Sequence, residues 1–235
     1  MVTYWVVGLA YLVPDLAHLP PAVVKTKHQR TREYRAGGTP FAPPLRKVVA
    51  NALMNQIFVL LPGLILLHEV STRFGWGIIV SRSLPTLQDV LLKSVAALLG
   101  VEIGFYYSHR LLHWKPLYRF HKVHHAFATP IALSAIYSHP LEAFLSSTVA
   151  IIGVGFFVRM HLLHFLASIV VGWGRTCHGH SGYAFPTGDG FHDRHHSINT
   201  GNYGVLTILD WLHGTTIIVK KKNKYSTRVL TSQSV

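Results

Sequence analysis

The chain has 235 residues, of which 22 are Lys or Arg and 9 are Asp or Glu, so its formal net charge is 22 − 9 = +13 with histidine neutral. Apolar residues make up 49% and charged residues 13% of the chain, whereas an ordinary soluble domain carries roughly 25% charged residues. This balance excludes a disordered chain and argues against an ordinary soluble domain. The single cysteine, Cys177, excludes an internal disulfide, a zinc site made of thiolates and an iron–sulfur cluster.

Apolar residues are gathered in segments of helical length. The first segment, 2–19, is interrupted by polar residues, and we predict a shortened first membrane helix there rather than a signal peptide. Segments 48–70 and 87–107 are each long enough to cross the roughly 30 Å hydrocarbon layer of a bilayer, which takes about 20 residues. Segments 141–158 and 162–173 are shorter, so we predict that they form a tight helical hairpin in the membrane.

These segments predict an all-α integral membrane protein with about four membrane helices. The histidine motifs at 109–113, 121–125 and 192–196 add a cytosolic, histidine-rich helical domain that is expected to hold two metal ions. Residues 1–107 are expected to form the first membrane helices and a basic cytosolic loop. Residues 108–235 are expected to form the catalytic domain, including a membrane hairpin at 141–173. The alternative is a buried helical core in a soluble protein, but four such segments leave too little polar surface to coat them.

The basic residues predict the orientation. Segment 25–47 holds seven Lys or Arg residues and one Glu, whereas segment 71–86 holds only two Arg. By the positive-inside rule the first segment is cytosolic, which returns residues 108–140 and 175–235 to the cytosolic side after two crossings and the hairpin. Nucleic acid is not the expected partner, because the basic residues flank apolar segments and contact with anionic head groups explains them more simply.

Three histidine motifs lie in these cytosolic segments. Residues 109–113 read HRLLH, residues 121–125 read HKVHH and residues 192–196 read HDRHH. Positions i, i+3 and i+4 share one face of a helix, so each motif can direct its imidazoles to one point. The candidate metal ligands are His109, His113, His121, His124, His125, His180, His192, His195 and His196, with His139 and His178 as further candidates.

The number and type of these ligands indicate two metal ions and restrict their identity. One ion takes four to six ligands, whereas more than that converge here. Imidazole suits zinc, copper, iron and nickel, but structural zinc sites are four-coordinate and commonly use cysteine. The carboxylate-bridged di-iron bundle needs Glu-x-x-His pairs, and this chain has none. The remaining reading is a histidine-rich di-iron centre that activates dioxygen, with zinc able to occupy it in a purified sample.

The motifs resemble those of the fatty acid hydroxylase/sterol desaturase superfamily, and within it the C4-methylsterol monooxygenases and the fatty acid hydroxylase domain-containing relatives. Besides the three histidine motifs, the resemblance rests on 138–142 (SHPLE), 180–183 (HSGY) and 202–215 (NYGVLTILDWLHGT), and it covers roughly 48–216. The sequence departs from the relatives in two respects. They have a His or Asp four residues after His180, where this chain has Ala184, and they have further sequence at the N-terminus.

The resemblance implies a membrane-bound oxidase that uses O2 to hydroxylate an unactivated C–H bond of a sterol, with oxidation of a C4-methyl group in sterol biosynthesis as the first expectation. The alternatives are sterol desaturation and hydroxylation of a fatty acyl or sphingoid chain. A further alternative, favoured by Ala184, is a degenerate relative that binds sterol or metal without catalysis.

The resemblance also implies partners and a location. The chain has no nucleotide-binding glycine loop and no haem motif, so electrons are expected from cytochrome b5 and its NAD(P)H-dependent reductase. Other enzymes of the sterol pathway are further expected partners. The expected location is the endoplasmic reticulum membrane, crossed several times, with the histidine domain facing the cytosol.

Four carboxylates are candidates for supporting roles. Asp193 and Glu142 are expected to hold the N–H groups of ligand imidazoles, and Asp210 is a further candidate for this role. Glu102 lies inside a predicted membrane helix, where a carboxylate is costly, so it is a functional candidate by default.

Overall fold

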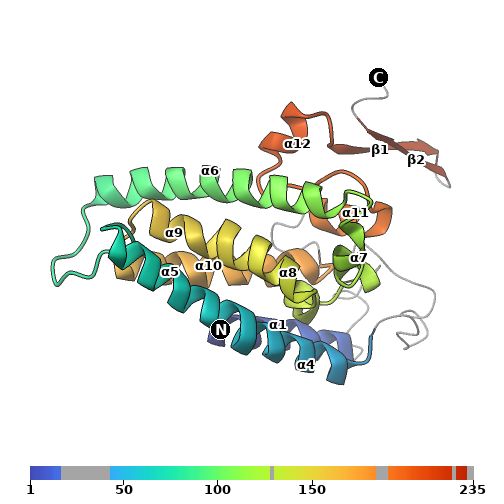
Figure 1. Ribbon diagram of the computed structural model, residues 1–235. Coiled ribbons are helices and arrows are strands. Elements are labelled where there is room, and N and C mark those ends of the chain that lie inside the picture. The colour runs from blue at the N-terminus through green and yellow to red at the C-terminus, as the bar shows by residue number, and fades with distance from the viewer. Residues whose placement is uncertain (17–42, 128–129, 184–189, 224–225, 232–235) are drawn as a thin grey trace.

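The computed structural model describes residues 1–16, 43–127, 130–183, 190–223 and 226–231. In these ranges the chain is mostly helical, and its long helices lie side by side in one bundle (Figure 1). The predicted all-α membrane fold is therefore confirmed, apart from one short β-hairpin near the C-terminus.

Three continuous helices are long and apolar enough to cross a membrane, judged by length and composition, against the four or so predicted. The apolar helix α1 (Val2–Leu16) is shorter, and α10 (Leu162–His180) is not among the three. The first runs through α4 (Leu45–Asn55), the π-helical turn η1 (Gln56–Leu60) and α5 (Leu61–Arg73). The second is α6 (Leu87–Leu112). The third runs through α8 (Pro140–Glu142), the π-helical segment η4 (Ala143–Ile152) and α9 (Gly153–Phe157).

The helix α6 begins at a threonine cap, because the Thr86 hydroxyl accepts a hydrogen bond from the Asp89 amide at 3.1 Å. In the most apolar stretch of 18 residues of this helix, only 11% is buried inside the protein, which is the pattern of a helix surrounded by lipid. The predicted division of the chain between residues 107 and 108 falls inside this helix.

Small residues bring the helices close together. A Cβ atom at Gly63 in α5 would lie 2.4 Å from the Thr148 Cγ2 atom of η4, and one at Gly104 in α6 would lie 3.1 Å from the Ala150 Cβ atom of the same segment. Close approach of this kind is how helices associate in lipid, where burial of apolar surface gives no driving force.

The predicted hairpin is present as α9 and α10, joined by a turn in which Arg159 has a φ of 55°. The short helix α1 packs on α10, where the Cys177 side chain is fully buried, and on η3 (Ala132–Ile136), where the Leu133 carbonyl oxygen accepts from the Tyr4 hydroxyl at 2.6 Å. The N-terminal helix thus supports the end of the bundle that carries the histidines.

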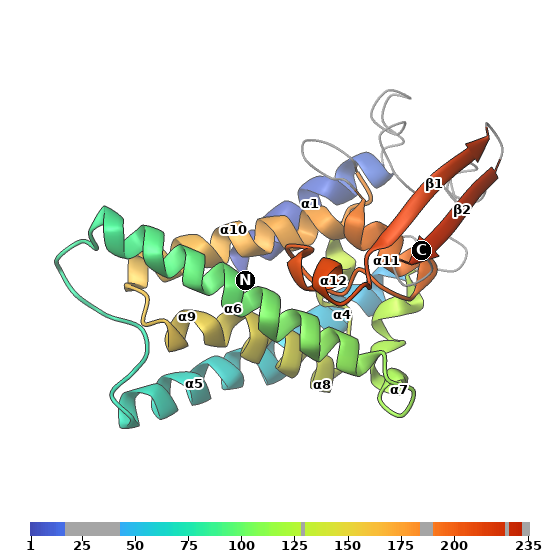
Figure 2. The same cartoon turned by 90° about the horizontal axis from the view of Figure 1, so that it is seen from above.

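The remaining elements gather at that same end (Figures 1 and 2). They are α7 (Tyr118–His121), η2 (His124–Ala126), η3 (Ala132–Ile136), α11 (Phe191–Ile198), α12 (Ile208–Leu212), β1 (Ile217–Asn223) and β2 (Ser226–Thr231).

The strands β1 and β2 form an antiparallel pair in which Ile217 lies opposite Thr231. This pair departs from the predicted all-α fold. Its physical reason is the run of β-branched residues before Lys220, which favours a strand.

Candidate metal centre

The fold brings the histidine motifs together as two neighbouring groups at the end of the bundle. Within each group every residue offers one ligand atom, and these atoms lie within 4.8 Å of one another. These two groups account for all nine of the principal candidate ligands. The first group is His109, His113, His121, His125 and His195, and the second is His124, His180, His192 and His196.

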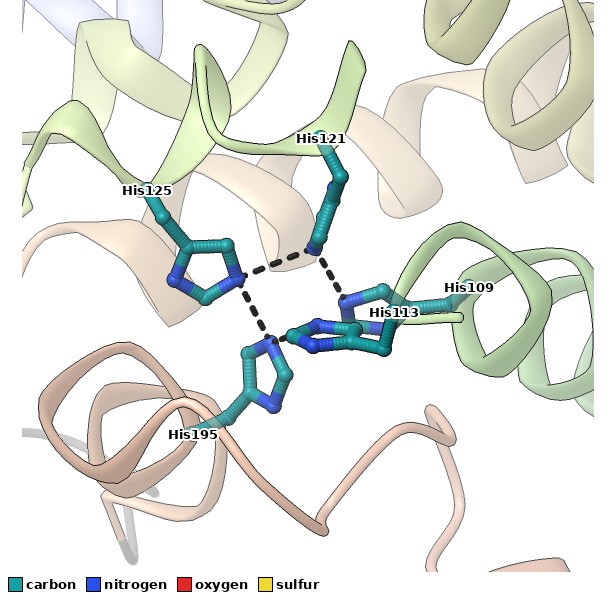
Figure 3. A group of neighbouring side chains, drawn as sticks. All are labelled: His109, His113, His121, His125 and His195. Atoms are coloured by element: carbon teal, nitrogen blue, oxygen red, sulfur yellow. Dashed lines mark hydrogen bonds between the residues drawn. The ribbon is translucent and has the colours of Figure 1, made fainter. Parts of the chain in front are cut away.

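In the first group the Nε2 atoms point to a common centre (Figure 3). The Nε2 atom of His121 lies 3.1 Å from that of His109 and 2.9 Å from that of His125. The Nε2 atom of His195 lies 3.0 Å from that of His125 and 3.2 Å from that of His113. The five imidazoles come from α6, α7, η2 and α11 and the residue after α6, so the centre ties distant parts of the chain together.

The second group repeats this arrangement with four imidazoles. The Nε2 atom of His180 lies 3.2 Å from that of His124 and 3.0 Å from that of His192, which in turn lies 3.1 Å from that of His196. Ala184, where the relatives are expected to have a His or Asp, lies outside the described residues.

The spacing between the nitrogens fits a metal ion. With metal–nitrogen bonds of about 2.1 Å, two ligands at right angles are about 3.0 Å apart, and two at the tetrahedral angle are about 3.4 Å apart. The observed separations of 2.9 to 3.2 Å are closer to the right-angled arrangement. Right-angled ligands are typical of six-coordinate ions, and five or four histidines leave positions for other ligands.

Most ligand imidazoles are fixed through their other nitrogen. When Nδ1 donates its proton to a carbonyl oxygen, Nε2 is left with a lone pair for a metal. Without a cation between them, such lone pairs would face each other unpaired. The Nδ1···O distances are 2.8 Å from His109 to Tyr203, 3.2 Å from His124 to Tyr137, 2.8 Å from His180 to Thr176, 2.7 Å from His195 to Gly201 and 3.1 Å from His196 to Phe127.

A carboxylate holds one further ligand. The Glu142 Oε1 atom lies 2.9 Å from the Nδ1 atom of His121, and the Glu142 side chain is buried. This is the kind of contact expected for Glu142 from the sequence. Asp193 is also buried, in α11 between His192 and His195.

Burial keeps the imidazoles neutral, which is the form that binds metal. Burial, reinforced by the neighbouring His124, lowers the pKa of His113 to about 4. Burial alone lowers the pKa of His124 to about 4, and burial together with His124 lowers that of His180 to about 3. For the same reasons the pKa values are also below the ordinary range at His121, His125, His192, His195 and His196.

Glu102 does not reach the histidines, although it lies in a membrane helix. Its carboxylate accepts hydrogen bonds from the backbone amides of Val205 at 2.7 Å, Leu206 at 2.6 Å and Leu209 at 3.0 Å. The cost of placing a carboxylate in α6 is therefore offset by three amide donors. Its role is to hold the segment 203–209 against α6.

Asp210 secures the same segment from the other side. Its carboxylate accepts from the amides of Tyr203 at 2.9 Å and Gly204 at 2.6 Å. Because the Tyr203 carbonyl oxygen accepts from His109 Nδ1, both carboxylates support a ligand through the backbone. A Cβ atom at Gly204 would lie 2.7 Å from the Glu102 Oε1 atom, so a side chain there would displace the Glu102 carboxylate or the segment itself.

The two further candidates, His139 and His178, belong to neither group. His139 caps α8, since its Nδ1 atom accepts from the Leu141 amide at 3.1 Å. The Nδ1 atom of His178 lies 2.9 Å from the Tyr11 hydroxyl of α1. His178 precedes His180 by two residues, which directs it roughly 160° away around the helix α10.

The carbonyl partners of the histidines are the functional groups that sequence reasoning missed. They belong to the main chain, so no residue type identifies them. The one sequence signal is the Gly-Asn pair at 201–202, since both residue types tolerate the left-handed backbone found there, with φ values of 75° and 53°. The Gly201 carbonyl oxygen in this turn faces His195.

A cavity of about 850 Å³ leads to the histidines. Its lining includes His109 and His180 at one end and Val90, near the start of α6, at the other. The 19 residues from Val90 to His109 correspond to about 28 Å along the helix axis. Apolar side chains such as Phe105 and Trp173 make up much of the wall, which suits a long apolar ligand.

Comparison with known proteins agrees with this site. The sequence model of the fatty acid hydroxylase family matches residues 94–215, which contain both histidine groups. No solved structure matches the chain.

Three relatives show that proteins similar to this chain carry different functional names. The fatty acid hydroxylase domain-containing protein 2 of Macaca fascicularis is 35% identical over 79% of this chain and 56% of its own length. The fatty acid hydroxylase ahd1 of Mycosarcoma maydis is 31% identical over 89% of this chain and 54% of its own length. The methylsterol monooxygenase 2-2 of Arabidopsis thaliana is 30% identical over 72% of this chain and 68% of its own length. The chain thus spans little more than half the length of some relatives, and it belongs to the fatty acid hydroxylase family.

Proposed function

We propose that this chain is a membrane-bound di-iron oxidase that uses O2 to hydroxylate an unactivated C–H bond of a sterol, at a C4-methyl group. The observation that carries the proposal is the position of the two histidine groups at one end of a long, largely apolar cavity. A lipid lying in this cavity has one of its ends beside the metal centre.

Iron is the proposed metal because of the ligand set. The donors are imidazoles only, five in one group and four in the other, and five donors exceed the four ligands of a tetrahedral zinc site. A bound iron pair supplies the activation of dioxygen. The proposed ligands are the nine histidines of the two groups, without His139 and His178, and zinc can replace iron in a purified sample.

The chain itself positions the imidazole ligands and protects the metal centre from water. The backbone carbonyl groups and Glu142 fix six of the nine imidazole rings, so that Nε2 faces the metal in each of these six. The apolar wall of the cavity, including Phe105 and Trp173, excludes water and orients the substrate chain.

Two substrate classes are supported by different observations. The name of the Arabidopsis relative supports a methylsterol. The length of the cavity along α6, together with the name of the Mycosarcoma relative, supports hydroxylation of a fatty acyl or sphingoid chain as the second candidate. Both candidates use the same metal centre, as a sterol desaturase would.

The electrons are proposed to come from cytochrome b5 and its NAD(P)H-dependent reductase, at the endoplasmic reticulum membrane. Four exposed basic residues, Arg110, Lys115, Arg119 and Lys122, lie beside the histidine groups at the end of α6 and around α7. An acidic donor protein would meet complementary charge there. We place this face in the cytosol, where other enzymes of the sterol pathway are also expected partners.

The decisive experiment is expression in a yeast strain that lacks its own sterol C4-methyl oxidase, followed by lipid profiling. The full chain is expected to consume the accumulated 4-methyl sterols, and His121→Ala is expected to abolish this. The matched control is His68→Ala, which removes an exposed histidine outside both groups.

The other outcomes separate the alternatives. New hydroxyacyl lipids with unchanged sterols would select the second candidate, and a new sterol double bond would select desaturation. An iron-loaded protein that consumes no oxygen with any lipid would show a relative that binds metal without catalysis.

A further inference from the structure

The short helix α12 buries its charged side chain and exposes its apolar ones, which is the reverse of a helix on a water-facing surface. Its one charged residue, Asp210, is fully buried, whereas Trp211 is 78% exposed and Leu212 is 64% exposed. Ile208, in the same helix, is exposed as well. Helices on a water-facing surface place their polar side outward, and exposed apolar patches of this kind mark contact with another apolar phase.

The helix α12 lies beside a candidate membrane span. Figure 1 shows it next to the C-terminal part of α6, on the side opposite α4 and α5. It is fixed there by the hydrogen bond from the Leu209 amide to Glu102, at 3.0 Å, and by the contact between the Tyr107 hydroxyl and His213 Nε2, at 2.9 Å.

The length of α6 gives the depth of these contacts. Its 26 residues span about 39 Å, which exceeds the roughly 30 Å hydrocarbon layer by about 9 Å. Glu102 and Tyr107 precede the last residue, Leu112, by 112 − 102 = 10 and 112 − 107 = 5 residues, or about 15 and 8 Å. With the excess on the histidine side, the Tyr107 contact lies about where the hydrocarbon layer ends, and the Glu102 contact lies about 6 Å inside it.

The exposed apolar residues of α12 continue those of α6. Ile103, Tyr107 and Leu111 follow one another at intervals of four residues and are all exposed, so they form a stripe on the lipid-facing side of α6. We name the exposed residues Val205, Ile208, Trp211 and Leu212 the α12 surface. Its tryptophan, like Tyr107, is of the type enriched where a membrane protein meets the head groups.

We propose that the α12 surface is embedded in the head-group layer of the bilayer and acts as an interfacial anchor on the histidine side. The segment that precedes α12 also lines the cavity, at Gly204, Leu206 and Thr207. The anchor thus holds one wall of the cavity at the membrane surface. The proposal depends on the membrane fold and not on the identity of the substrate.

The test uses single spin labels on the full chain in nanodiscs of phosphatidylcholine. Cys177 is fully buried and burial raises its thiol pKa to about 12, so it resists labelling. A nitroxide is attached at Trp211→Cys and, independently, at Leu212→Cys. The control is Lys122→Cys, at an exposed residue of the basic region that follows α7.

Collisions with oxygen, which concentrates in lipid, are compared with collisions with a water-soluble nickel chelate. We expect the labels at 211 and 212 to collide more with oxygen than with nickel, and the label at 122 to show the reverse. Preference for nickel at 211 and 212 would place the α12 surface in water and overturn the proposal. Low collision rates with both reagents would show a covering protein, such as a second copy of the chain, and would overturn it equally. Variants are compared only if their elution volume matches that of the unmodified protein.

Discussion

At the residue scale, each ligand imidazole has two nitrogens with different tasks. The Nε2 atoms of both groups converge, while Nδ1 of His109 and of His195 donates to a carbonyl oxygen of the segment 201–203. His121 differs, because its Nδ1 atom faces the carboxylate of Glu142. A carboxyl oxygen that accepts from Nδ1 leaves the Nε2 lone pair of His121 for a metal.

Replacement of that carboxyl group is expected to weaken metal binding. In Glu142→Gln the side chain keeps its size, but an amide that can also turn its NH2 group toward Nδ1 replaces the carboxyl group, so His121 is held less well as a ligand. We expect metal affinity to fall by about 10- to 100-fold, which is typical of groups that orient a ligand. Metal content after dialysis against graded chelator concentrations measures the change, and Glu69→Gln, at an exposed residue of α5, is the control. Equal metal retention by both variants would contradict the assigned role of Glu142.

The candidate histidines could be listed from the sequence because their motifs stand out without coordinates. The expectation that each motif directs its imidazoles to one point is wrong for two of the motifs, since His121 and His125 belong to the first group and His124 to the second, and HDRHH divides in the same way. The role of Glu102 could not be predicted. Its partners are three main-chain amides, 103 or more residues later in the chain, and only the fold brings them to α6. The same reason hides the carbonyl groups that hold the imidazoles. His139 and His178 lie outside both groups, and spacing alone could not predict this because it does not give the direction of a side chain.

At the element scale, the contact between α6 and the segment 203–209 connects the membrane helices to the metal site. The segment meets α6 through Glu102 and reaches His109 through the Tyr203 carbonyl oxygen. Gly204 lies close to both the Glu102 and the Asp210 carboxylates. Any group added there must displace one of these carboxylates from its amide donors or push the segment away from α6.

Gly204→Ala is therefore expected to destabilise the protein. The added methyl group overlaps the Glu102 carboxylate, and we expect a loss of about 1–3 kcal/mol in the free energy of unfolding, as for other overpacked sites. Thermal unfolding in detergent micelles gives the change in midpoint. Gly172→Ala in α10 is the matched control, because a Cβ atom there has no other atom within 4 Å. An equal midpoint for both variants would show that the segment yields without cost.

At the scale of the whole molecule, both histidine groups lie at one end of the bundle, and the turn between α5 and α6 lies at the other (Figure 2). Hydropathy could predict this arrangement, since three of the expected apolar segments are helices long enough to span a membrane. It could not predict the α12 surface, because five residues are too few to stand out from the surrounding polar sequence.

The orientation predicts that the region 108–235 is cytosolic, and the basic loop 25–47 with it. Protease added to sealed microsomes is expected to remove an epitope placed after the tail residues 220–224, while a tag in the turn 71–86 stays protected until detergent is added. Protection of the C-terminal epitope in intact microsomes would reverse the orientation. The turn tag serves as the control for sealed vesicles.

The metal centre also has a mechanical consequence for the chain. Each group joins helices that are far apart in sequence, since the first runs from His109 to His195 and the second from His124 to His196. Two bound ions would therefore act as reversible cross-links across five separate elements, α6, α7, η2, α10 and α11, and the free energy of binding would be added to the stability of the fold. We expect the metal-free protein to open first at this end and to be recognised by cellular proteases there. Its abundance in a cell would then follow the supply of its metal, without any change in transcription.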